Sequence, residues 1–465
     1  MSRTRFVQAF VFAGLVTTAL AGTTAAHAQT PSTLPAAPPA AAAASTNTAT
    51  PIKHFVFLMQ ENHSFDNYFG TYPGADGIPA DVCMPVAPKS NSTECVKPSR
   101  VGNRPALDLS HNPTTHAAQY DGGKMDGFVS AFSTRAAGEL AMAHYDDQDL
   151  PYYWNIADNY VLFDRFFSSA HGGSVRNHMY WVAGQPGSAE TGKEAVPLAG
   201  WGDTIPTIFD RLEAAGISWK FYIQNYDPTA TIRSQRVGDK GAQVVWAPLL
   251  AMDRFLDNPE LSKKIVNLSE YFNDLHNNTL PSVAFIVPSG TSEHPPGSIQ
   301  AGEAFVRTLI NGLVQSSAWS SSAFLWSYDD WGGFYDHVAP PQVDSSGYGF
   351  RVPALLVSPY AKRGFVDHTT LDFTAGIAFI RDNWGVAPLA SRDTQAASFM
   401  DAFDFKSGPR QAVLLSSSRV VPKVQATRSG LLYSAYGTAV VLPIAIVFVA
   451  LKRKRPRLIP ERGLA

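Results

Sequence analysis

Short apolar runs alternate with amphipathic stretches between about residues 52 and 390 of this chain. Five of the runs have the length of a strand and are rich in bulky and β-branched residues, at positions 52–59, 219–223, 282–287, 322–327 and 353–358. Runs that are apolar on both faces are typical of strands buried inside a domain.

Helical periodicity separates some of these runs. Residues 204–215 are amphipathic and end at Gly216, a residue that favours a helix end. A second helical stretch, residues 301–316, places four apolar residues on one side: Ala304, Phe305, Leu309 and Leu313. The order strand, helix, strand predicts an α/β fold with a mostly parallel central sheet and helices on both faces, over residues 52–390.

The N-terminus has the pattern of a targeting segment. Arg3 and Arg5 precede an apolar stretch, small residues and the sequence Ala-His-Ala. This order predicts a secretory signal peptide over residues 1–28. Residues 29–51, rich in Ala, Pro, Thr and Ser, are expected to form a flexible linker.

The C-terminus carries a second membrane signal. Residues 391–430 are polar and irregular, and we expect a stalk there. Residues 431–451 contain no charged residue and are long enough to cross a bilayer of about 30 Å, although a buried helix is the alternative. The basic tail, 452–465, then predicts an exported, single-pass membrane protein with its catalytic domain outside the cytoplasm.

Charge and cysteine usage narrow the function classes. The net charge of -2, with no basic stripe before the last residues, argues against a nucleic-acid partner. The two cysteines, Cys83 and Cys95, lie close together in a loop-like segment of a chain expected to be exported. We therefore expect a disulfide between them.

Polar side chains follow two of the predicted strands. Glu61 and Asn62 follow the first run, and Asp329 and Asp330 follow the run at 322–327. Ligands of open α/β sheets bind beyond the carboxyl ends of strands. Two adjacent carboxylates repel each other unless a cation lies between them, so these four residues predict a site for Ca²⁺, Mg²⁺ or Mn²⁺.

Ser174 is the candidate nucleophile. Two glycines precede it and let the backbone approach a ligand closely, although such a sequence is also common in plain turns. A bound cation would lower the pKa of the hydroxyl. Because no G-x-S-x-G sequence surrounds Ser174, a serine hydrolase triad is disfavoured. Four histidines lie in Gly- and Pro-rich segments typical of site loops: His111, His178, His294 and His337.

Five motifs carry a resemblance to a known family: ENHSFDNYFG, GGKMDGF, HGGSVRNH, SEHPP and YDDWGGFYDHV, which begin at residues 61, 122, 171, 292 and 328. With them, residues 52–380 resemble the bacterial phosphoesterase family that contains the phosphocholine-preferring phospholipases C and the respiratory-burst-inhibiting acid phosphatase. The family has an alkaline-phosphatase-like superfold.

This resemblance implies a metal-dependent phosphate-ester hydrolase with a phosphoserine intermediate. It implies that Ser174 is the nucleophile and a metal ligand, together with Glu61, Asn62, Asp329 and Asp330. His111 and His294 match positions around the phosphoryl group, and His337 lies in a matching motif.

The substrate class stays open between two branches of that family. Serine at position 174 is similar to the acid phosphatases, which act on phosphomonoesters. Glu293-His294 replaces their histidine pair and is closer to the phospholipases C, which release diacylglycerol from phospholipids. A membrane-anchored protein that binds the metal without catalysis is a third hypothesis, but no position of the ligand set is broken.

Overall fold

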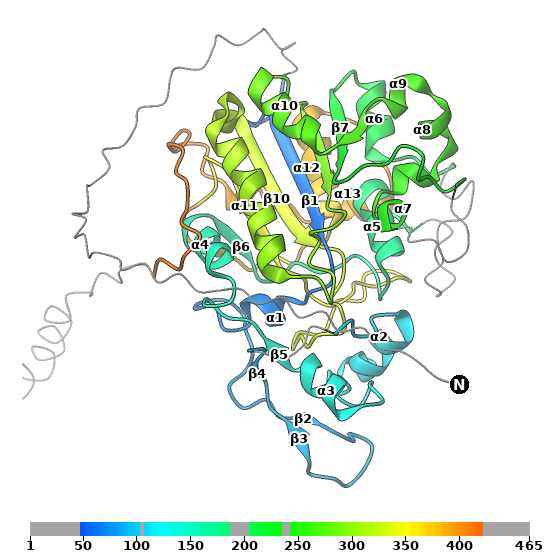
Figure 1. The fold of residues 1–465 in the computed structure, drawn as a ribbon, viewed down its shortest axis with the longest axis vertical. Coiled ribbons are helices and arrows are strands. Elements are labelled where there is room, and N and C mark those ends of the chain that lie inside the picture. The colour runs from blue at the N-terminus through cyan, green and yellow to red at the C-terminus, as the bar shows by residue number, and fades with distance from the viewer. Residues whose placement is uncertain (1–46, 103–106, 187–203, 235–241, 422–465) are drawn as a thin grey trace, which may run out of the picture. The chain divides into compact units, whose positions relative to one another are not determined.

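The computed structural model describes residues 47–102, 107–186, 204–234 and 242–421. Its centre is an eight-stranded sheet with the strand order β12-β6-β11-β10-β1-β9-β7-β8 (Figure 1). The strands are β1 (His54–Gln60), β6 (Val161–Phe163), β7 (Trp219–Ile223), β8 (Ile265–Asn267), β9 (Val283–Val287), β10 (Ser322–Tyr328), β11 (Ala354–Val357) and β12 (Phe365–Asp367). All of them are parallel except β11, which is antiparallel to both neighbours.

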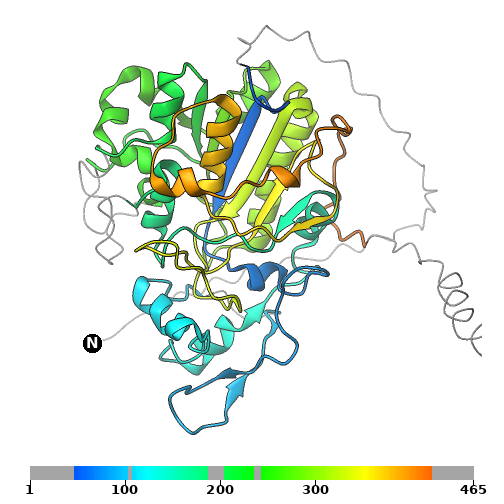
Figure 2. The ribbon, with the colours of Figure 1, turned by 180° about the vertical axis from the view of Figure 1, so that it is seen from behind.

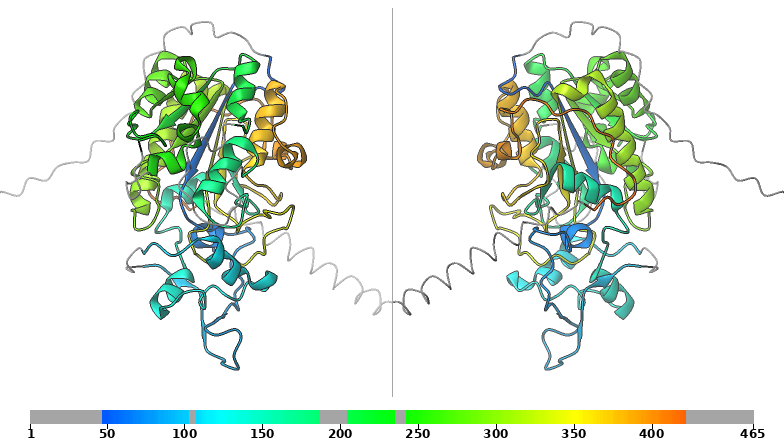
Figure 3. Two further views of the ribbon diagram at one scale, coloured as in Figure 1. Left: turned by 90° about the vertical axis from the view of Figure 1, so that its right-hand side faces the viewer. Right: turned by 90° about the vertical axis from the view of Figure 1, so that its left-hand side faces the viewer.

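Helices cover both faces of this sheet (Figures 1 and 3). One face carries α4 (Pro151–Asn159), α10 (Ser269–Asn277) and α11 (Ile299–Gln315), and Figure 2 shows α12 (Thr374–Trp384) and α13 (Ser391–Gln395) on the other face. There α5 (Ser174–Ala183) contacts α12 and α6 (Ile208–Ala214). The helices α7 (Ala242–Trp246), η3 (Pro248–Ala251), α8 (Asp253–Asp257), α9 (Pro259–Ser262), η4 (Ser317–Ser321) and η5 (Met400–Ala402) complete the described part of this region.

The five strands predicted from apolar runs and the mostly parallel α/β sheet are confirmed. The prediction for the buried side of α11 is wrong in part, because Ala304 is exposed and Phe305 only half-buried. The helix instead buries the row that contains Val306, Ile310 and Leu313. Branched side chains at those positions bury more apolar surface than an alanine does, so they face the sheet.

Residues 70–150 form an insertion of short elements: β2 (Met84–Pro85), β3 (Cys95–Val96), β4 (Ser99–Arg100), α2 (Pro113–Tyr120), η1 (Asp121–Gly123), α3 (Arg135–Ala141) and β5 (Ala143–His144). It follows α1 (Phe65–Phe69) and lies beyond the carboxyl ends of β1 and β10 (Figure 1). The expected disulfide between Cys83 and Cys95 is present and joins β3 to the residue before β2. The insertion therefore lies next to the predicted site.

Part of the segment expected as a stalk packs on the catalytic body. Arg419 forms ion pairs with Asp147 and Asp158, and Phe403 pairs with Ala361. The folded region thus continues past residue 390 to at least this arginine.

The expected signal peptide and the expected membrane helix at 431–451 both lie outside the described residues. Among the helices that the structure describes, none combines the length and the apolar character that crossing a membrane requires.

Candidate active site

The strands β1 and β10 end side by side, and this register brings the four predicted metal ligands together. Gln60 pairs with Tyr328, so Glu61 and Asp329 follow at the same level of the sheet. The backbone N–H of Asn62 donates to Asp329 Oδ1 at 3.1 Å. Glu61, Asn62, Asp329 and Asp330 are all fully buried. The predicted carboxylate cluster therefore exists.

A glycine turn fixes the two strand ends against each other. Gly332 has a φ of 63° and donates its N–H to Asp330 Oδ1 at 2.9 Å. A Cβ atom at this glycine would lie 2.2 Å from the carbonyl oxygen of Asn62. Only glycine fits so close to another backbone, which explains its place two residues after Asp330.

Ser174 reaches the cluster from a different strand, β6, through the loop that follows it. Gly172 and Gly173 have φ values of 67° and 86°, and Ser174 is the first residue of α5. Its hydroxyl oxygen lies 3.5 Å from Asp330 Oδ2. The two glycines thus turn the chain so that a buried hydroxyl faces a buried carboxylate.

His178 lies one helical turn after Ser174 and faces the same cluster. Its Nδ1–H donates to the carbonyl oxygen of Ser174 at 2.8 Å, and its Nε2 lies 3.3 Å from Glu61 Oε1. Burial lowers the pKa of this imidazole and favours the neutral form, although the Asp329 charge opposes the shift. A neutral Nε2 and a carboxylate oxygen both present lone pairs, so a cation between them would be favourable.

The place of His178 beside the carboxylates follows from the tertiary structure rather than from the sequence motif. Glu61, His178 and Asp329 offer ligand atoms that all lie within 4.8 Å of one another. His178 lies four residues, or one helical turn, after Ser174, and this spacing is the sequence signal that indicates it.

The residues present fit a divalent cation. Asp329 Oδ2 is buried and accepts no hydrogen bond from the described residues. One amide atom of Asn62 lies 2.9 Å from His111 Nε2, and the other lies 2.9 Å from Glu61 Oε2 and 3.3 Å from Asp329 Oδ1. With a cation bound, the amide oxygen would face the carboxylates and the NH₂ group would donate to His111. Such a set of hard oxygen donors suits Ca²⁺, Mg²⁺ or Mn²⁺.

His111 and His294 lie at the edge of the cluster. The ring of His111 is held by a hydrogen bond from Nδ1 to the carbonyl oxygen of Leu109 at 2.7 Å. Its centroid lies 5.7 Å from that of His294, which comes from the loop after β9. Both imidazoles are half-buried: His111 contacts Asn62 of the cluster, and His294 lies beside His111.

The helix α2 fixes the loop that carries His111. Asn112 caps this helix by accepting from the N–H of Thr115 at 2.9 Å. Gln119 on the same helix donates to the carbonyl oxygen of Gly333 at 2.8 Å and accepts from the indole of Trp331 at 2.6 Å. The insertion is thus bonded directly to the turn that follows Asp330.

A comparison with protein families identifies the chain. The model of the Phosphoesterase family matches residues 52–387. This protein belongs to the Phosphoesterase family. The match covers all four predicted strand-end ligands and Ser174, and the enzyme is a hydrolase acting on phosphoric ester bonds.

Phospholipases C are among the proteins similar to this chain. Phospholipase C A of Mycobacterium tuberculosis is 30% identical over 418 residues, which cover 77% of this chain and 78% of that protein. Non-hemolytic phospholipase C of Pseudomonas aeruginosa is 27% identical, and the match covers 78% of this phosphoesterase and 58% of that protein. Non-specific phospholipase C6 of Arabidopsis thaliana is 26% identical, with coverages of 80% and 76%.

Solved structures resemble this phosphoesterase only distantly. A protein in the alkaline phosphatase superfamily from Vibrio parahaemolyticus is 14% identical and has a TM-score of 0.36, with coverages of 77% and 73%. A TM-score this low supports no conclusion about the fold beyond the strand order of the sheet.

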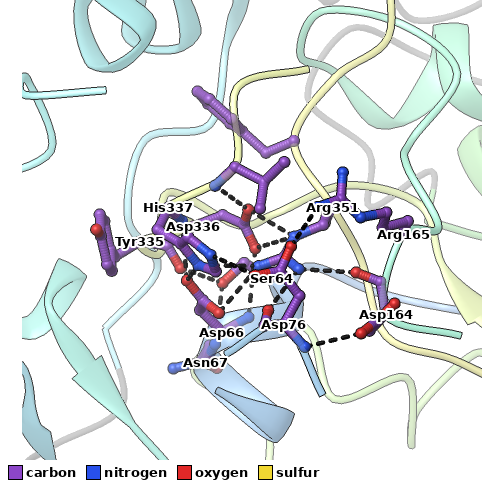
Figure 4. A network of polar contacts seen from close by, with 12 residues as sticks. Ser64, Asp66, Asn67, Asp76, Asp164, Arg165, Tyr335, Asp336, His337 and Arg351 are labelled. Carbon is purple, nitrogen blue, oxygen red and sulfur yellow. Dashed lines mark hydrogen bonds and ion pairs between the residues drawn. The ribbon is translucent and has the colours of Figure 1, made fainter. Parts of the chain in front are cut away.

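His337, the last predicted catalytic residue, lies in a separate buried network of the phosphoesterase (Figure 4). Its Nδ1 contacts Asp66 Oδ2 at 2.7 Å and its Nε2 contacts Asp76 Oδ1 at 3.2 Å. Arg351, fully buried, donates to Asp66 and to Asp336. The structure brings Ser174, His111 and His294 to the carboxylate cluster but groups His337 with these ion pairs.

The aromatic side chains near the site mostly pack in the core. Phe65, Tyr68 and Trp331 are fully buried. Arg351 covers the ring of Phe65 at 4.6 Å. Their burial leaves these rings no exposed face for a ligand.

Proposed function

We propose that this protein is a metal-dependent phosphoesterase that hydrolyses phospholipids in the manner of a phospholipase C, through a phosphoserine intermediate. The observation that supports it is the hydroxyl of Ser174, which faces Asp330 at 3.5 Å beside the buried carboxylates of Glu61 and Asp329. The substrate class rests on the relatives, which are phospholipases C from three organisms.

Five residues would hold the divalent cation: Glu61, Asn62, Ser174, Asp329 and Asp330. When bound, the cation supplies Lewis acidity and neutralises charge on the phosphoryl group. The neutral Nε2 of His178 faces the same space and is a further nitrogen donor.

In the first step the oxygen of Ser174 forms a bond to phosphorus, and the bond from phosphorus to the leaving oxygen breaks. Asp330 orients the hydroxyl and draws its proton away. His294, in its protonated form, gives a proton to the leaving alcohol, which is diacylglycerol for a phospholipid. Both ring nitrogens of His111 are engaged, Nδ1 with the carbonyl oxygen of Leu109 and Nε2 with the amide of Asn62, so His111 orients this amide.

In the second step water attacks the phosphorus bonded to Ser174. The bond to the serine oxygen breaks, Asp330 returns the proton to that oxygen, His294 takes a proton from the water, and the phosphorylated head group leaves. Positioning and charge neutralisation lower the barrier in both steps.

A phosphomonoesterase similar to the acid phosphatases is the second candidate, and Ser174 favours it. Glu293 does not favour the phospholipases C, because its carboxylate accepts hydrogen bonds from tyrosines in the core and does not face the site. Position 293 therefore does not select between the two substrate classes.

The two candidates are separated by parallel assays of the purified protein. We expect chelator-sensitive release of diacylglycerol from phosphatidylcholine vesicles, and none with Ser174→Ala. Release of phosphate from p-nitrophenyl phosphate alone would favour the monoesterase. Tight metal binding without turnover of either substrate would contradict both and favour a binding protein.

Export with the catalytic domain outside the cytoplasm remains part of the proposal. The disulfide between Cys83 and Cys95 supports it, because such bonds persist in oxidising compartments.

A further inference from the structure

Glu293 is a buried carboxylate with an unusual backbone, directly before the predicted site residue His294. Its φ is 70°, a left-handed conformation that a residue with a long side chain rarely adopts. Such strain persists only where the surrounding structure holds it in place. The contacts of the Glu293 side chain show which residues hold it in place.

Four donors converge on the two oxygens of this carboxylate. Gln60 donates to Oε1 at 3.0 Å, and the hydroxyl of Tyr153 donates to the same oxygen. The hydroxyls of Tyr68 and Tyr328 donate to Oε2 at 2.5 and 2.8 Å. Burial raises the pKa of Glu293 to about 7, and the bonds from the tyrosines oppose that shift. A carboxylate only accepts, so four donors match its charged form.

Two of the donors are chain neighbours of predicted metal ligands. Gln60 directly precedes Glu61 at the end of β1, and Tyr328 directly precedes Asp329 at the end of β10. Glu293 itself directly precedes His294 in the loop after β9. One carboxylate therefore joins the three strand ends from which the site residues extend.

The surroundings leave this side chain no alternative position. A Cβ atom at Gly302 of α11 would lie 2.0 Å from its Cγ. Its backbone carbonyl oxygen lies 3.2 Å from His63 Nε2. Both ends of the residue are thus fixed, and its motion is coupled to that of the strand ends.

We propose that Glu293 is a positioning residue that holds Glu61, Asp329 and His294 in their catalytic geometry through Gln60, Tyr328 and the peptide link to His294. The inference rests on the proposed function of this site. Residues that orient metal ligands are typically worth a factor of about 10 to 100 in metal affinity or activity.

The test compares two variants of Glu293 with a matched control in the full-length protein. Glu293→Gln keeps the shape, and its amide N–H can donate to Gln60 Oε1, which is buried without a hydrogen-bond partner among the described residues. Glu293→Ala removes the carboxylate altogether. Glu303→Gln is the control, because Glu303 is also buried and burial raises its pKa to about 7. It caps α4 through the N–H groups of Tyr152 and Tyr153 instead.

Three quantities are measured for each variant: kcat and KM on p-nitrophenyl phosphate and phosphatidylcholine, Mn²⁺ affinity without substrate, and urea unfolding. We expect Glu293→Gln to lower kcat and Mn²⁺ affinity about tenfold and Glu293→Ala about a hundredfold, with KM within about twofold. Glu303→Gln should lose stability but keep kcat and Mn²⁺ affinity within about twofold.

The proposal is overturned if Glu293→Gln, folded and loaded with Mn²⁺, stays within twofold of the unmodified protein in both kcat and affinity. An equal loss in Glu303→Gln also overturns it, because the effect would then be one of general stability. If Glu293→Ala does not fold, the kcat and Mn²⁺ affinity of Glu293→Gln test the proposal. If the unmodified protein hydrolyses neither substrate, the proposed function is wrong. The Mn²⁺ affinities of the Glu293 variants alone then test whether Glu293 positions the site residues.

Discussion

The hydroxyl oxygen of Ser174 and Oδ2 of Asp330 lie 3.5 Å apart, although 156 residues separate them in the chain. We expect Ser174→Ala to lower phosphoester hydrolysis at least about a thousandfold, because no other group replaces the lost nucleophile. Divalent-cation binding and the unfolding midpoint should stay close to those of the unmodified protein. Ser320→Ala, an exposed serine before β10, is the control and should keep full activity. Substantial turnover by Ser174→Ala would remove this serine from the mechanism.

Oδ2 of Asp329 has no hydrogen-bond partner among the described residues, and this predicts opposite effects of Asp329→Asn on stability with and without metal. Without metal, the variant should be at least as stable as the unmodified protein, since one of several crowded buried charges is gone. With metal, the unmodified protein gains about 2.7 kcal/mol at a cation concentration of a hundred times Kd, and the variant should lose most of this gain.

Urea unfolding with cation and with chelator measures this difference. Asp401→Asn, at an exposed position, should leave the metal-induced gain intact. A full gain in Asp329→Asn would show that this carboxylate is not a ligand.

Gly332→Ala should break the site through the backbone alone. The new Cβ would meet the carbonyl oxygen of Asn62 at 2.2 Å, so Asn62 or the turn after Asp330 must move. We expect a loss of Mn²⁺ affinity and of kcat by about tenfold or more, because misplacement by about 1 Å can cost a hundredfold.

Gly385→Ala separates this clash from simple backbone strain. Gly385 has a φ of 68°, close to that of Gly332, but a Cβ there would meet no atom within 4 Å. Both variants should lose about 1 kcal/mol of stability from the left-handed conformation. Equal Mn²⁺ affinities in the two would contradict the proposed role of the turn.

His116 should destabilise the protein in acid. Burial lowers its pKa to about 3 from the ordinary 6.5, and its ring stacks on Phe350 at 4.3 Å. As the pH falls below 6.5, the unfolded chain takes up this proton while the folded state does not, so stability present above pH 6.5 is lost toward pH 3. At pH 4.5 the loss amounts to about 2 to 3 kcal/mol.

His116→Phe removes this loss and keeps an aromatic ring in place. Urea unfolding at pH 7.5 and 4.5 should show a smaller difference for the variant than for the unmodified protein. His276→Phe, at an exposed position, should leave the difference unchanged. An equal loss of stability between pH 7.5 and 4.5 in all three proteins would refute a role of His116 in acid destabilisation.

The residues of the carboxylate cluster were predictable because each depends on one strand. Glu61, Asn62, Asp329 and Asp330 lie just after the ends of β1 and β10, and parallel strands end at the same edge of a sheet. Ser174 was predictable from its two glycines and from the family motif. These residues lie at the end of a strand or in a turn, and both features can be recognised from the local sequence.

Other features depended on which segments meet in space. The apolar run of β11 predicts a strand but not its antiparallel direction, which the connection and the neighbouring strands decide. His337 sits in a site motif, yet its partners Asp66 and Arg351 come from elsewhere in the chain and form a separate ion-pair network.

The sequence by itself determined the α/β class, five of the eight strands of the central sheet, the family and the residues of the carboxylate cluster, because local hydrophobic pattern and motif carry that information. Only the tertiary structure decided that His178 faces Glu61 and that Glu293 bonds Gln60 and Tyr328. The physical reason is that a buried polar group takes its partners from whatever the fold brings within about 3 Å, however far apart they are in the chain.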